Sequence, residues 1–301
     1  MKRVLKWLGI VLGGLIVVIG IFILVVFLLA NSKVNKSYTI EAAVTVPDDQ
    51  ISIERGRHLV ETIGLCVECH GDDLAGDLLS DDPVFGTIAP RNLTSGQGGI
   101  GATFTDADYV RAIRHGVGKD GKALLIMPSN YYNRLSDVDL GAIIAYLKTI
   151  PAVDNELPES SLALAGKIFT LVDGSIIPAS VIDHEAPRPA DPVPGATEEY
   201  GEYLAVVCSA CHGKTLSGGP LPGGDPDGGP APIAPNIPPG GPIGDWTKEE
   251  FFATIRTGVT PYGKTLDTEN MPWPGFAQLS DDELSAIWLY LTSLEAREFE
   301  K

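Results

Sequence analysis

The chain has 301 residues, of which 44% are hydrophobic, so it is long enough for two domains of ordinary size. Its formal net charge is −17. Because the first 36 residues contain five basic residues and no acidic one, the remainder holds 17 basic and 39 acidic residues, a net charge of −22. A body with this charge repels phosphate backbones, so we expect no nucleic-acid partner. The acidic surface suits either a basic protein partner or simple solubility.

The chain begins with a stretch that is apolar enough to cross a membrane. Residues 7–30 contain no charged side chain, and a helix of this length, at about 1.5 Å per residue, spans the hydrocarbon core of a bilayer. A cleaved signal peptide is the competing interpretation, but the apolar run is long for one and FLLANSK lacks a small residue three positions before a plausible cut. We therefore expect residues 1–36 to form an uncleaved single-pass anchor in the cytoplasmic membrane.

The charges beside the apolar run predict its orientation. Basic residues precede it, and an acidic body follows the lysines at 33 and 36. By the positive-inside tendency, the N-terminus lies in the cytoplasm and the rest of the chain on the periplasmic or extracytoplasmic side.

An internal repeat follows the anchor. At an offset of 142 residues Cys66 aligns with Cys208 and Arg114 with Arg256, and FTDADYVRAIRHGVGKDGKAL aligns with WTKEEFFATIRTGVTPYGKTL. The repeat predicts two tandem domains of about 100 residues each. The predicted divisions are the anchor (1–36), a tether (37–50), domain 1 (51–152), a linker (153–196) and domain 2 (197–296).

Both copies carry the same helix signals. A serine or threonine followed three residues later by an acid predicts a capping box, and Gly116 and Gly258 predict helix ends. Apolar residues at i, i+3, i+4 and i+7 predict one buried face on each closing helix. Strand alternation is not convincing anywhere, so both domains are predicted to be all-α. The four predicted capping pairs are Thr105 with Asp108, Ser136 with Asp139, Thr247 with Glu250, and Ser280 with Glu283.

Two segments are predicted to be less regular. The linker contains LALAGKIFTLV, which predicts a short helix, and then the extended proline-rich segment HEAPRPADPVPG. In domain 2, residues 213–244 contain 10 glycines and 9 prolines in 32 residues, too many for regular structure. We expect a loop there, and it could wrap a ligand.

All four cysteines lie in two copies of one motif, CVECHG and CSACHG. A disulfide or a redox dithiol would not need a histidine directly after the second cysteine. A zinc site needs four ligands close together, whereas each motif offers three. Covalent attachment of haem c explains the pattern, with two thioethers and an adjacent proximal histidine. The predicted sites are Cys66, Cys69 and His70 for one haem, and Cys208, Cys211 and His212 for a second.

The sixth iron ligand is predicted to be methionine. Met127 and Met271 lie 57 and 59 residues after the motif histidines, at corresponding places in the repeat, and the chain has no other internal methionine. Three remaining histidines are rivals, at positions 58, 115 and 184, but they are not matched between the copies and read as surface residues. A thioether ligand raises the potential, which suits electron transfer, and with both axial positions filled no site is open to oxygen or peroxide.

Further residues are candidates for supporting roles. The backbone carbonyls of Pro90 and Pro235, 20 and 23 residues after the motif histidines, could accept a hydrogen bond from the ligating imidazoles. Arg114 and Arg256 could pair with haem propionates. Solvation on a helix surface explains the two arginines equally well.

With these motifs in place, each half resembles a class I c-type cytochrome domain. In that family a glycine on the first helix packs against an aromatic residue on the last, and a proline carbonyl supports the proximal histidine. The resemblance implies these roles for Gly56 with Tyr146, for Gly201 with Tyr290, and for the two prolines.

The segments IAPRNLT, FTDADYVRAIRHGVGKDGKAL and MPSNYYNRLSDVDLGAIIAYLKTIP are also similar to the cytochrome c subunits of periplasmic alcohol, aldehyde and gluconate dehydrogenases. This similarity covers nearly all of residues 50–152 and weakens in the second domain. Members of that group commonly carry three haems and a C-terminal anchor, whereas this chain has two motifs and an N-terminal apolar stretch.

The leading functional prediction is a membrane-anchored dihaem carrier that passes single electrons from a periplasmic donor, such as a dehydrogenase, to a respiratory-chain acceptor. Residues 31–50 could extend to about 65 Å and let the head swing, whereas packing of VPDDQ would make the protein a fixed subunit of a larger complex. The alternative is a haem enzyme, such as a dihaem peroxidase or a thiosulfate-oxidising cytochrome. It would need a vacant or displaceable iron ligand, which two matched methionines and the lack of a spare cysteine disfavour.

Overall fold

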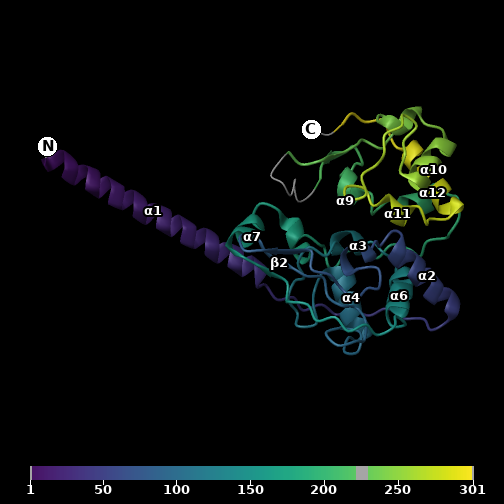
Figure 1. Cartoon of the computed structure of the whole chain (residues 1–301), viewed down its shortest axis with the longest axis horizontal. Coiled ribbons are helices and arrows are strands. Elements are labelled where there is room, and N and C mark those ends of the chain that lie inside the picture. Colours follow the sequence, from purple (N-terminus) through teal and green to yellow (C-terminus); the bar gives the residue numbers. More distant parts are fainter. Residues whose placement is uncertain (1, 222–229, 300–301) are drawn as a thin grey trace.

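The computed structural model of the chain describes residues 2–221 and 230–299. A single long helix, α1 (Lys2–Val34), projects from a globular head that contains the two repeats (Figure 1). Its apolar segment Lys6–Val34 has a mean hydropathy of 3.3 over its best window, and it is the one helix among the described residues that is long and apolar enough to cross a membrane. Most of its large apolar side chains are exposed.

Domain 1 is built around a packed pair of helices, the first and the last of the repeat. Gly56 lets these helices meet, because a Cβ there would lie 1.9 Å from the carbonyl oxygen of Ala142. A side chain of any size would push the helices apart. The helices of domain 1 are α2 (Gln50–Glu61), α3 (Val67–His70), α4 (Asp106–His115), α5 (Ser129–Tyr132) and α6 (Asp137–Leu147).

Domain 2 repeats this arrangement. A Cβ at Gly201 would lie 1.9 Å from the carbonyl oxygen of Ala286 and 2.9 Å from Cβ of Tyr290. The predicted glycine contact therefore involves the aromatic residue in domain 2, while in domain 1 the closest neighbour is the backbone one turn before Tyr146. The helices of domain 2 are α8 (Glu198–Leu204), α9 (Ser209–His212), α10 (Lys248–Thr257), α11 (Trp273–Phe276) and α12 (Asp281–Ser293), with the 3-10 turn η3 (Pro242–Asp245) before α10.

Three of the four predicted capping boxes are complete, and both predicted end glycines adopt left-handed conformations. At the start of α6, Ser136 accepts a hydrogen bond from the amide of Asp139, but the Asp139 carboxylate binds Arg55 instead of closing the box. The capping pattern predicted the start of α6 correctly. A local pattern could not show that Arg55, 84 residues away, binds the Asp139 carboxylate.

The head is mostly helical, with two small antiparallel sheets that the sequence pattern did not predict. The first has the order β1-β2-β3 and the second pairs β4 with β5. Strands β4 and β5 lie inside the predicted glycine- and proline-rich loop (213–244), which therefore contains a short strand pair; residues 222–229 of this loop lie outside the described residues. The strands are β1 (Ser80–Asp82), β2 (Gly86–Ile88), β3 (Ser161–Leu162), β4 (Gly219–Pro220) and β5 (Ile233–Ala234).

The predicted tether packs along domain 1. Ser37 forms a β-bridge with Lys122, and the amide of Tyr38 donates to the carbonyl of Gly121 over 2.8 Å. Further along, the carbonyl of Thr45 lies against Gly141 of α6 so closely that a Cβ there would be 2.2 Å away. The segment is therefore seated on the head and does not extend freely, which favours the fixed alternative over a swinging head.

The predicted linker also covers domain 1. Its β3 strand pairs with β2, and the predicted short helix is present as α7 (Leu164–Phe169), which packs against α1. After α7 come two 3-10 turns, η1 (Gly174–Ile176) and η2 (Pro178–Ser180). The carbonyl of Ile176 accepts a hydrogen bond of 2.9 Å from the amide of Ile126, directly before Met127. The linker therefore helps to position the methionine loop.

Candidate haem-binding sites

Both cysteine motifs adopt the same local structure. Each is a one-turn helix, α3 or α9, and in each the amide of the histidine donates to the carbonyl of the first cysteine over 2.9 Å. Side chains three and four residues apart lie on one face of a helical turn. The two cysteines and the histidine of a motif therefore share one face.

The four cysteines are free thiols, as covalent haem attachment requires of the polypeptide. Burial raises the pKa of Cys66 and of Cys208 to about 12. A redox-active dithiol needs the opposite shift, because its thiolate is the reactive form. In residues 2–221 and 230–299 no cluster of three or more His, Cys, Asp and Glu side chains is arranged to hold a metal ion. The geometry therefore favours neither a redox dithiol nor a zinc site.

The motif histidines are oriented by backbone carbonyls. Nδ1 of His70 donates to the carbonyl of Arg91 over 2.8 Å, and Nδ1 of His212 donates to the carbonyl of Pro235 over 2.8 Å. Burial lowers the pKa of both imidazoles, and these hydrogen bonds oppose the shift. The lowered pKa favours the neutral form of each ring, and in the part of the chain that the structure describes Nδ1 is engaged while Nε2 has no hydrogen-bond partner. An imidazole that ligates iron needs this state.

The acceptor in domain 1 was predicted one residue too early. The carbonyl of Pro90 does not accept from His70; it lies against Gly76, 2.6 Å from where a Cβ would be. In domain 2 the same place, beside Gly218, is taken by the carbonyl of Ala234. Pro90 is therefore the structural counterpart of Ala234, and the histidine acceptors are the residues that follow.

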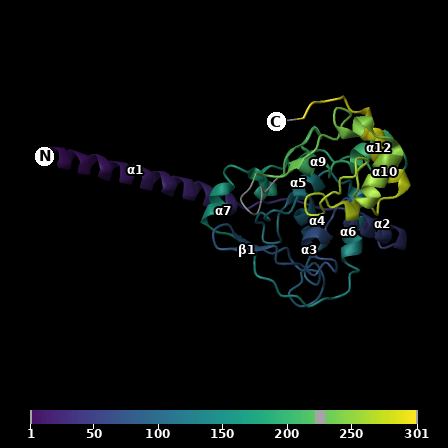
Figure 2. The ribbon, with the colours of Figure 1, turned by 45° about the horizontal axis from the view of Figure 1, so that its top comes forward.

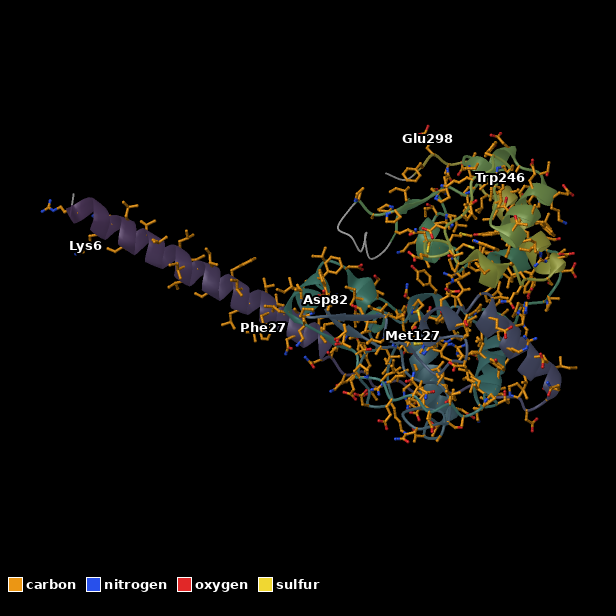
Figure 3. All side chains as sticks on the ribbon, in the orientation of Figure 1. Lys6, Phe27, Asp82, Met127, Trp246 and Glu298 are labelled. Atoms are coloured by element: carbon orange, nitrogen blue, oxygen red, sulfur yellow. The ribbon has the colours of Figure 1, made fainter. Side chains whose placement is uncertain are left out.

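The methionine loops turn in the same way in both domains. The carbonyl of Met127 accepts from the amide of Ser129, and that of Met271 accepts from the amide of Trp273, each over about 2.7–2.8 Å. In domain 1 the loop is tied to the cysteine motif, because the buried hydroxyl of Tyr132 donates to the carbonyl of Gly64. Figure 3 shows Met127 in the part of domain 1 that faces domain 2.

A family model described as "Cytochrome C oxidase, cbb3-type, subunit III" matches residues 52–147 and 196–291, which are the two repeats. Together these matches cover more than half of the chain. The chain belongs to this cytochrome c family. The family and the two motifs together support covalently bound haem c as the cofactor.

The cytochrome is also similar to electron-transfer subunits of dehydrogenases. It is 31% identical over 284 residues to the cytochrome c subunit of the quinone alcohol dehydrogenase of Komagataeibacter europaeus, a match that covers 84% of this chain and 58% of the relative. It is 31% identical over 264 residues to the fructose dehydrogenase cytochrome subunit of Gluconobacter japonicus, covering 82% of this chain and 53% of the relative.

A third relative is the gluconate 2-dehydrogenase cytochrome c subunit of Pantoea cypripedii, 30% identical over 295 residues, with 83% of this chain and 62% of the relative covered. The cytochrome thus spans a little more than half the length of these curated relatives. The predicted resemblance to cytochrome subunits of alcohol and gluconate dehydrogenases is confirmed.

The two predicted propionate partners bind protein acceptors. Arg114 is buried, and it contacts the Asp137 carboxylate at 2.6 Å and the carbonyls of Leu135 and Ser136. Arg256 donates to the carbonyl of Ala277 and, over 2.8 Å, to a carboxylate at the start of α12, that of Asp281. Both guanidinium groups therefore tie the third helix of a repeat, α4 or α10, to the closing helix.

Solvation on a helix surface does not describe Arg114, which is only 2% exposed. Its Nε is buried and has no hydrogen-bond partner among the described residues. One donor of this arginine thus stays available, and propionate pairing remains a prediction for both arginines.

The three histidines outside the motifs are not ordinary surface residues. His115 is buried, and its Nδ1 lies 3.1 Å from Nδ1 of His184. Burial, together with the charges of Arg188 and its other neighbours, lowers the pKa of His115 to about 4. His58 reaches across the domain interface to Glu283, over 2.7 Å. All three have protein partners, and both ring nitrogens of His184 are engaged, since its Nε2 also lies 3.0 Å from the carbonyl of Ala179.

The two candidate sites approach each other where the domains meet. A Cβ at Gly275, in the methionine loop of domain 2, would lie 2.4 Å from Cδ2 of Leu65, the residue before Cys66. The methionine loop of domain 2 therefore packs against the residue directly before the cysteine motif of domain 1. The turned view in Figure 2 shows the two domains stacked at the same end of α1.

Charged and phenolic side chains from four helices cross this interface. Arg55 binds Asp139 in its own domain and Glu283 in the other, each at 3.1 Å. The hydroxyl of Tyr203, from α8, donates to Asp139 over 2.8 Å. Sequence reasoning did not find this cluster. His58 and Tyr203 each follow the packing glycine of their domain by two residues, and each reaches an acid on the opposite closing helix.

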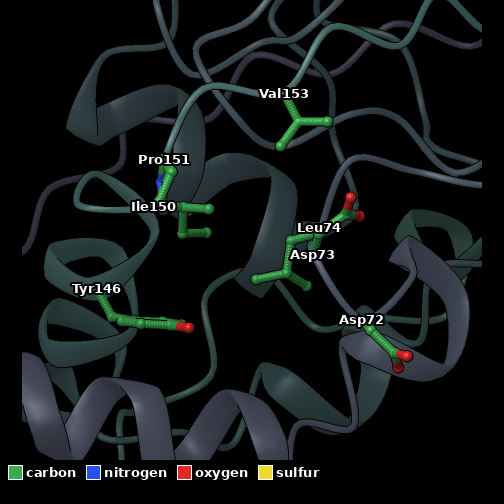
Figure 4. Close-up of a pocket in the computed structure, with 7 residues that line it drawn as sticks. All are labelled: Asp72, Asp73, Leu74, Tyr146, Ile150, Pro151 and Val153. Atoms are coloured by element: carbon green, nitrogen blue, oxygen red, sulfur yellow. The ribbon is translucent and has the colours of Figure 1, made fainter.

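A cavity of about 210 Å³ lies directly behind the first cysteine motif. Figure 4 shows Tyr146 of α6 pointing into it beneath Ile150, with Leu74 on the opposite wall. The tyrosine predicted to pack against Gly56 therefore also lines the space behind the candidate site. Its lining residues are Asp72, Asp73, Leu74, Tyr146, Ile150, Pro151 and Val153.

Proposed function

We propose that this cytochrome is a membrane-anchored dihaem electron-transfer subunit that carries single electrons from a dehydrogenase to a respiratory acceptor. The observation that carries the proposal is the repeated geometry of the motif histidines. In both domains Nδ1 is fixed by a carbonyl, Nε2 has no hydrogen-bond partner among residues 2–221 and 230–299, and two free thiols lie in the same motif.

The residues present fit two haem c groups. Cys66 and Cys69 would form the thioethers of one group and Cys208 and Cys211 those of the other, with His70 and His212 as proximal ligands. Met127 and Met271 would fill the sixth positions. Haem c supplies a one-electron iron couple, and the protein holds, orients and shields it.

Interdomain packing supports a relay between the two groups. The methionine loop of domain 2 packs against Leu65, directly before the cysteine motif of domain 1, and the charged cluster around Arg55 links α2 and α6 to α8 and α12. Transfer between the two groups would then need no movement of the domains. Both axial positions are filled in this account, so the cytochrome conducts electrons and does not catalyse a reaction at iron.

The anchor and the tether support a fixed position on the membrane. The apolar length of α1 and the basic residues before it favour a span with the N-terminus in the cytoplasm. Because residues 37–47 pack on domain 1, the head would keep one orientation relative to α1. This arrangement favours a fixed subunit of a complex over a tethered shuttle.

The nature of the donor follows from the relatives. They are named as cytochrome subunits of alcohol, fructose and gluconate dehydrogenases, so a dehydrogenase is the donor class that we propose here. The net charge of −22 on residues 37–301 suits a basic docking surface on that partner.

A covalent haem count tests the proposal directly. We expect two haems per chain in the protein produced with haem attachment, measured after denaturation against protein concentration. Cys66→Ala with Cys69→Ala should leave one haem, and Cys208→Ala with Cys211→Ala should leave the other. A single haem in the unaltered protein would contradict the dihaem account.

A further inference from the structure

The head carries an exposed apolar surface at the base of α1. It is formed by the tip of the β1–β2 hairpin and by α7 with the residues after it, and both lie next to α1 in Figure 1. The most exposed member, Val172, is 82% accessible. We name this surface the basal patch; its members are Val84, Phe85, Leu164, Phe169, Leu171 and Val172.

The basal patch is built as one unit. The carbonyl of Phe85 accepts a hydrogen bond from the amide of Ala163 and lies against Gly166 of α7, where a Cβ would be 2.2 Å away. On the hairpin, the carboxylate of Asp82 accepts from the amides of Val84 and Phe85 over 2.8 and 2.7 Å. These bonds fix the turn that presents the two apolar side chains. Their exposure is therefore a property of ordered backbone.

The patch is also fastened to the end of α1. The ammonium group of Lys33 donates to the carbonyl of Thr170 over 2.5 Å, and that of Lys167 donates to the side-chain oxygen of Asn31 over 3.3 Å. Ala30, the last residue of the apolar run, is fully buried against the head. The height of the patch along the helix axis is therefore fixed.

That height coincides with the edge of a bilayer. At about 1.5 Å per residue, the uncharged run 7–30 is about 36 Å long, whereas a hydrocarbon core is about 30 Å thick. About one helical turn at the outer end is thus left over, and in the structure the head covers Ala30 of this turn while Leu28 and Leu29 stay exposed. An apolar surface at this level faces the boundary between acyl chains and headgroups.

We propose that the basal patch inserts into the outer leaflet of the membrane that α1 crosses, so that the head rests on the bilayer in one orientation. This rests on the proposed anchor. Charges of both signs lie beside the patch: Lys33 and Lys167, which fasten it to α1, and Asp82 and Asp173, which belong to its two segments. Insertion therefore depends on apolar contact rather than on anionic lipid, and it should be insensitive to salt.

Lipid is the occupant that the position favours. A soluble protein seldom leaves a contiguous apolar surface uncovered. A bilayer crossed by α1 would lie next to the basal patch, because α1 packs against α7. Docking at this point would present the rest of the head, including the domain interface, to a partner approaching from the aqueous side.

A pair of single-cysteine variants tests the proposal in the full-length protein. Haem attachment consumes the four native thiols, so Val172→Cys and Val193→Cys each supply one site for an environment-sensitive fluorophore. Val193, in the proline-rich segment, is 81% exposed and so matches Val172 in accessibility while lying outside the patch. Both proteins are reconstituted into vesicles of phosphatidylethanolamine and phosphatidylglycerol, with or without nitroxide-labelled acyl chains.

We expect nitroxide lipid to quench the probe at position 172 several-fold more than the probe at 193, at low and at high salt alike. Equal, weak quenching at the two positions, in protein that resists carbonate extraction, would overturn the patch proposal while leaving the anchor intact. Release of the protein by carbonate would instead contradict the anchor. Shielding of position 172 that needs native membranes and is absent in pure lipid would mean a protein occupant, and would also overturn the proposal.

Discussion

At the scale of single residues, each candidate site depends on an imidazole fixed by a backbone carbonyl and on the methionine predicted as the sixth ligand. The carbonyls of Arg91 and Pro235 fix the two motif histidines, each over 2.8 Å. With Nδ1 occupied, only Nε2 can meet an iron, so the protein decides both the tautomer and the direction of the ring. The two methionines are the residues whose role most directly separates an electron carrier from a haem enzyme.

Replacing one methionine should leave the sixth coordination position of one haem iron vacant. Met127→Leu keeps the volume and removes the thioether, so we expect the haem of domain 1 to bind carbon monoxide when reduced and to show a lowered potential. Met271→Leu should do the same in domain 2, which makes each variant the control for the other. Unchanged spectra and potentials in both variants would mean that neither methionine is a ligand.

The sequence predicted the haem-attachment motifs more accurately than the backbone groups around them. The cysteines and histidines were found because covalent attachment requires that spacing. The carbonyl acceptor in domain 1 was misplaced by one position, since the prediction paired Pro90 with Pro235, whereas the backbone pairs Pro90 with Ala234. A carbonyl is contributed by any residue type, so no side-chain signal could have corrected the error.

At the scale of elements, both domains rely on close contact between the first and the last helix. Gly56 and Gly201 each leave room for a carbonyl of the partner helix at a distance that no Cβ tolerates. The capping signals found the starts of α4, α6, α10 and α12 because they act within four residues. The conformations of the tether and the linker were harder to predict from the sequence, because their packing on domain 1 depends on backbone partners far away in the chain.

Filling the glycine contact should destabilise one domain at a time. Gly56→Ala places a methyl group against Ala142, so we expect the free energy of unfolding of the haem-loaded protein to fall by about 1–3 kcal/mol or more, measured with denaturant. Ile51→Ala, on the same helix but 84% exposed, is the control and should change it little. Equal stability in the two variants would show that α2 and α6 do not pack this closely.

At the scale of the whole molecule, the interdomain cluster fixes how the two candidate sites face each other. Burial alone would raise the pKa of Glu283, but the hydrogen bonds from His58 and Ser280 and the charges of His58 and Arg55 lower it to about 2 from a usual value of 4.5. The carboxylate is therefore charged in the folded protein at every pH at which the protein is expected to work. No local pattern in the sequence could predict this contact, because Arg55 and Glu283 are 228 residues apart.

Acid should weaken the interface through this carboxylate. A group whose pKa is lowered by folding stabilises the protein above its unfolded pKa, and the contribution is lost as the pH falls from about 4.5 to about 2. The loss amounts to at most about 3 kcal/mol for a shift of this size. Glu283→Gln keeps the capping geometry and should flatten the pH dependence of unfolding in that range.

The adjacent Asp282 provides the matched control for this prediction, because it is exposed in the same helical turn. Asp282→Asn should leave the acid dependence as it is in the unaltered protein. If Glu283→Gln and Asp282→Asn gave the same profile between pH 4.5 and pH 2, the cluster would not contribute to interface stability.

The central claim is that both irons are held by histidine and methionine with no position open. The measurement that tests it most directly is a reductive titration of the haem-loaded protein under carbon monoxide, followed optically. The account predicts two covalent haems that reduce at raised potentials and form no carbon monoxide adduct. A haem that titrates low and binds carbon monoxide would contradict it, and would make that iron a candidate catalytic centre.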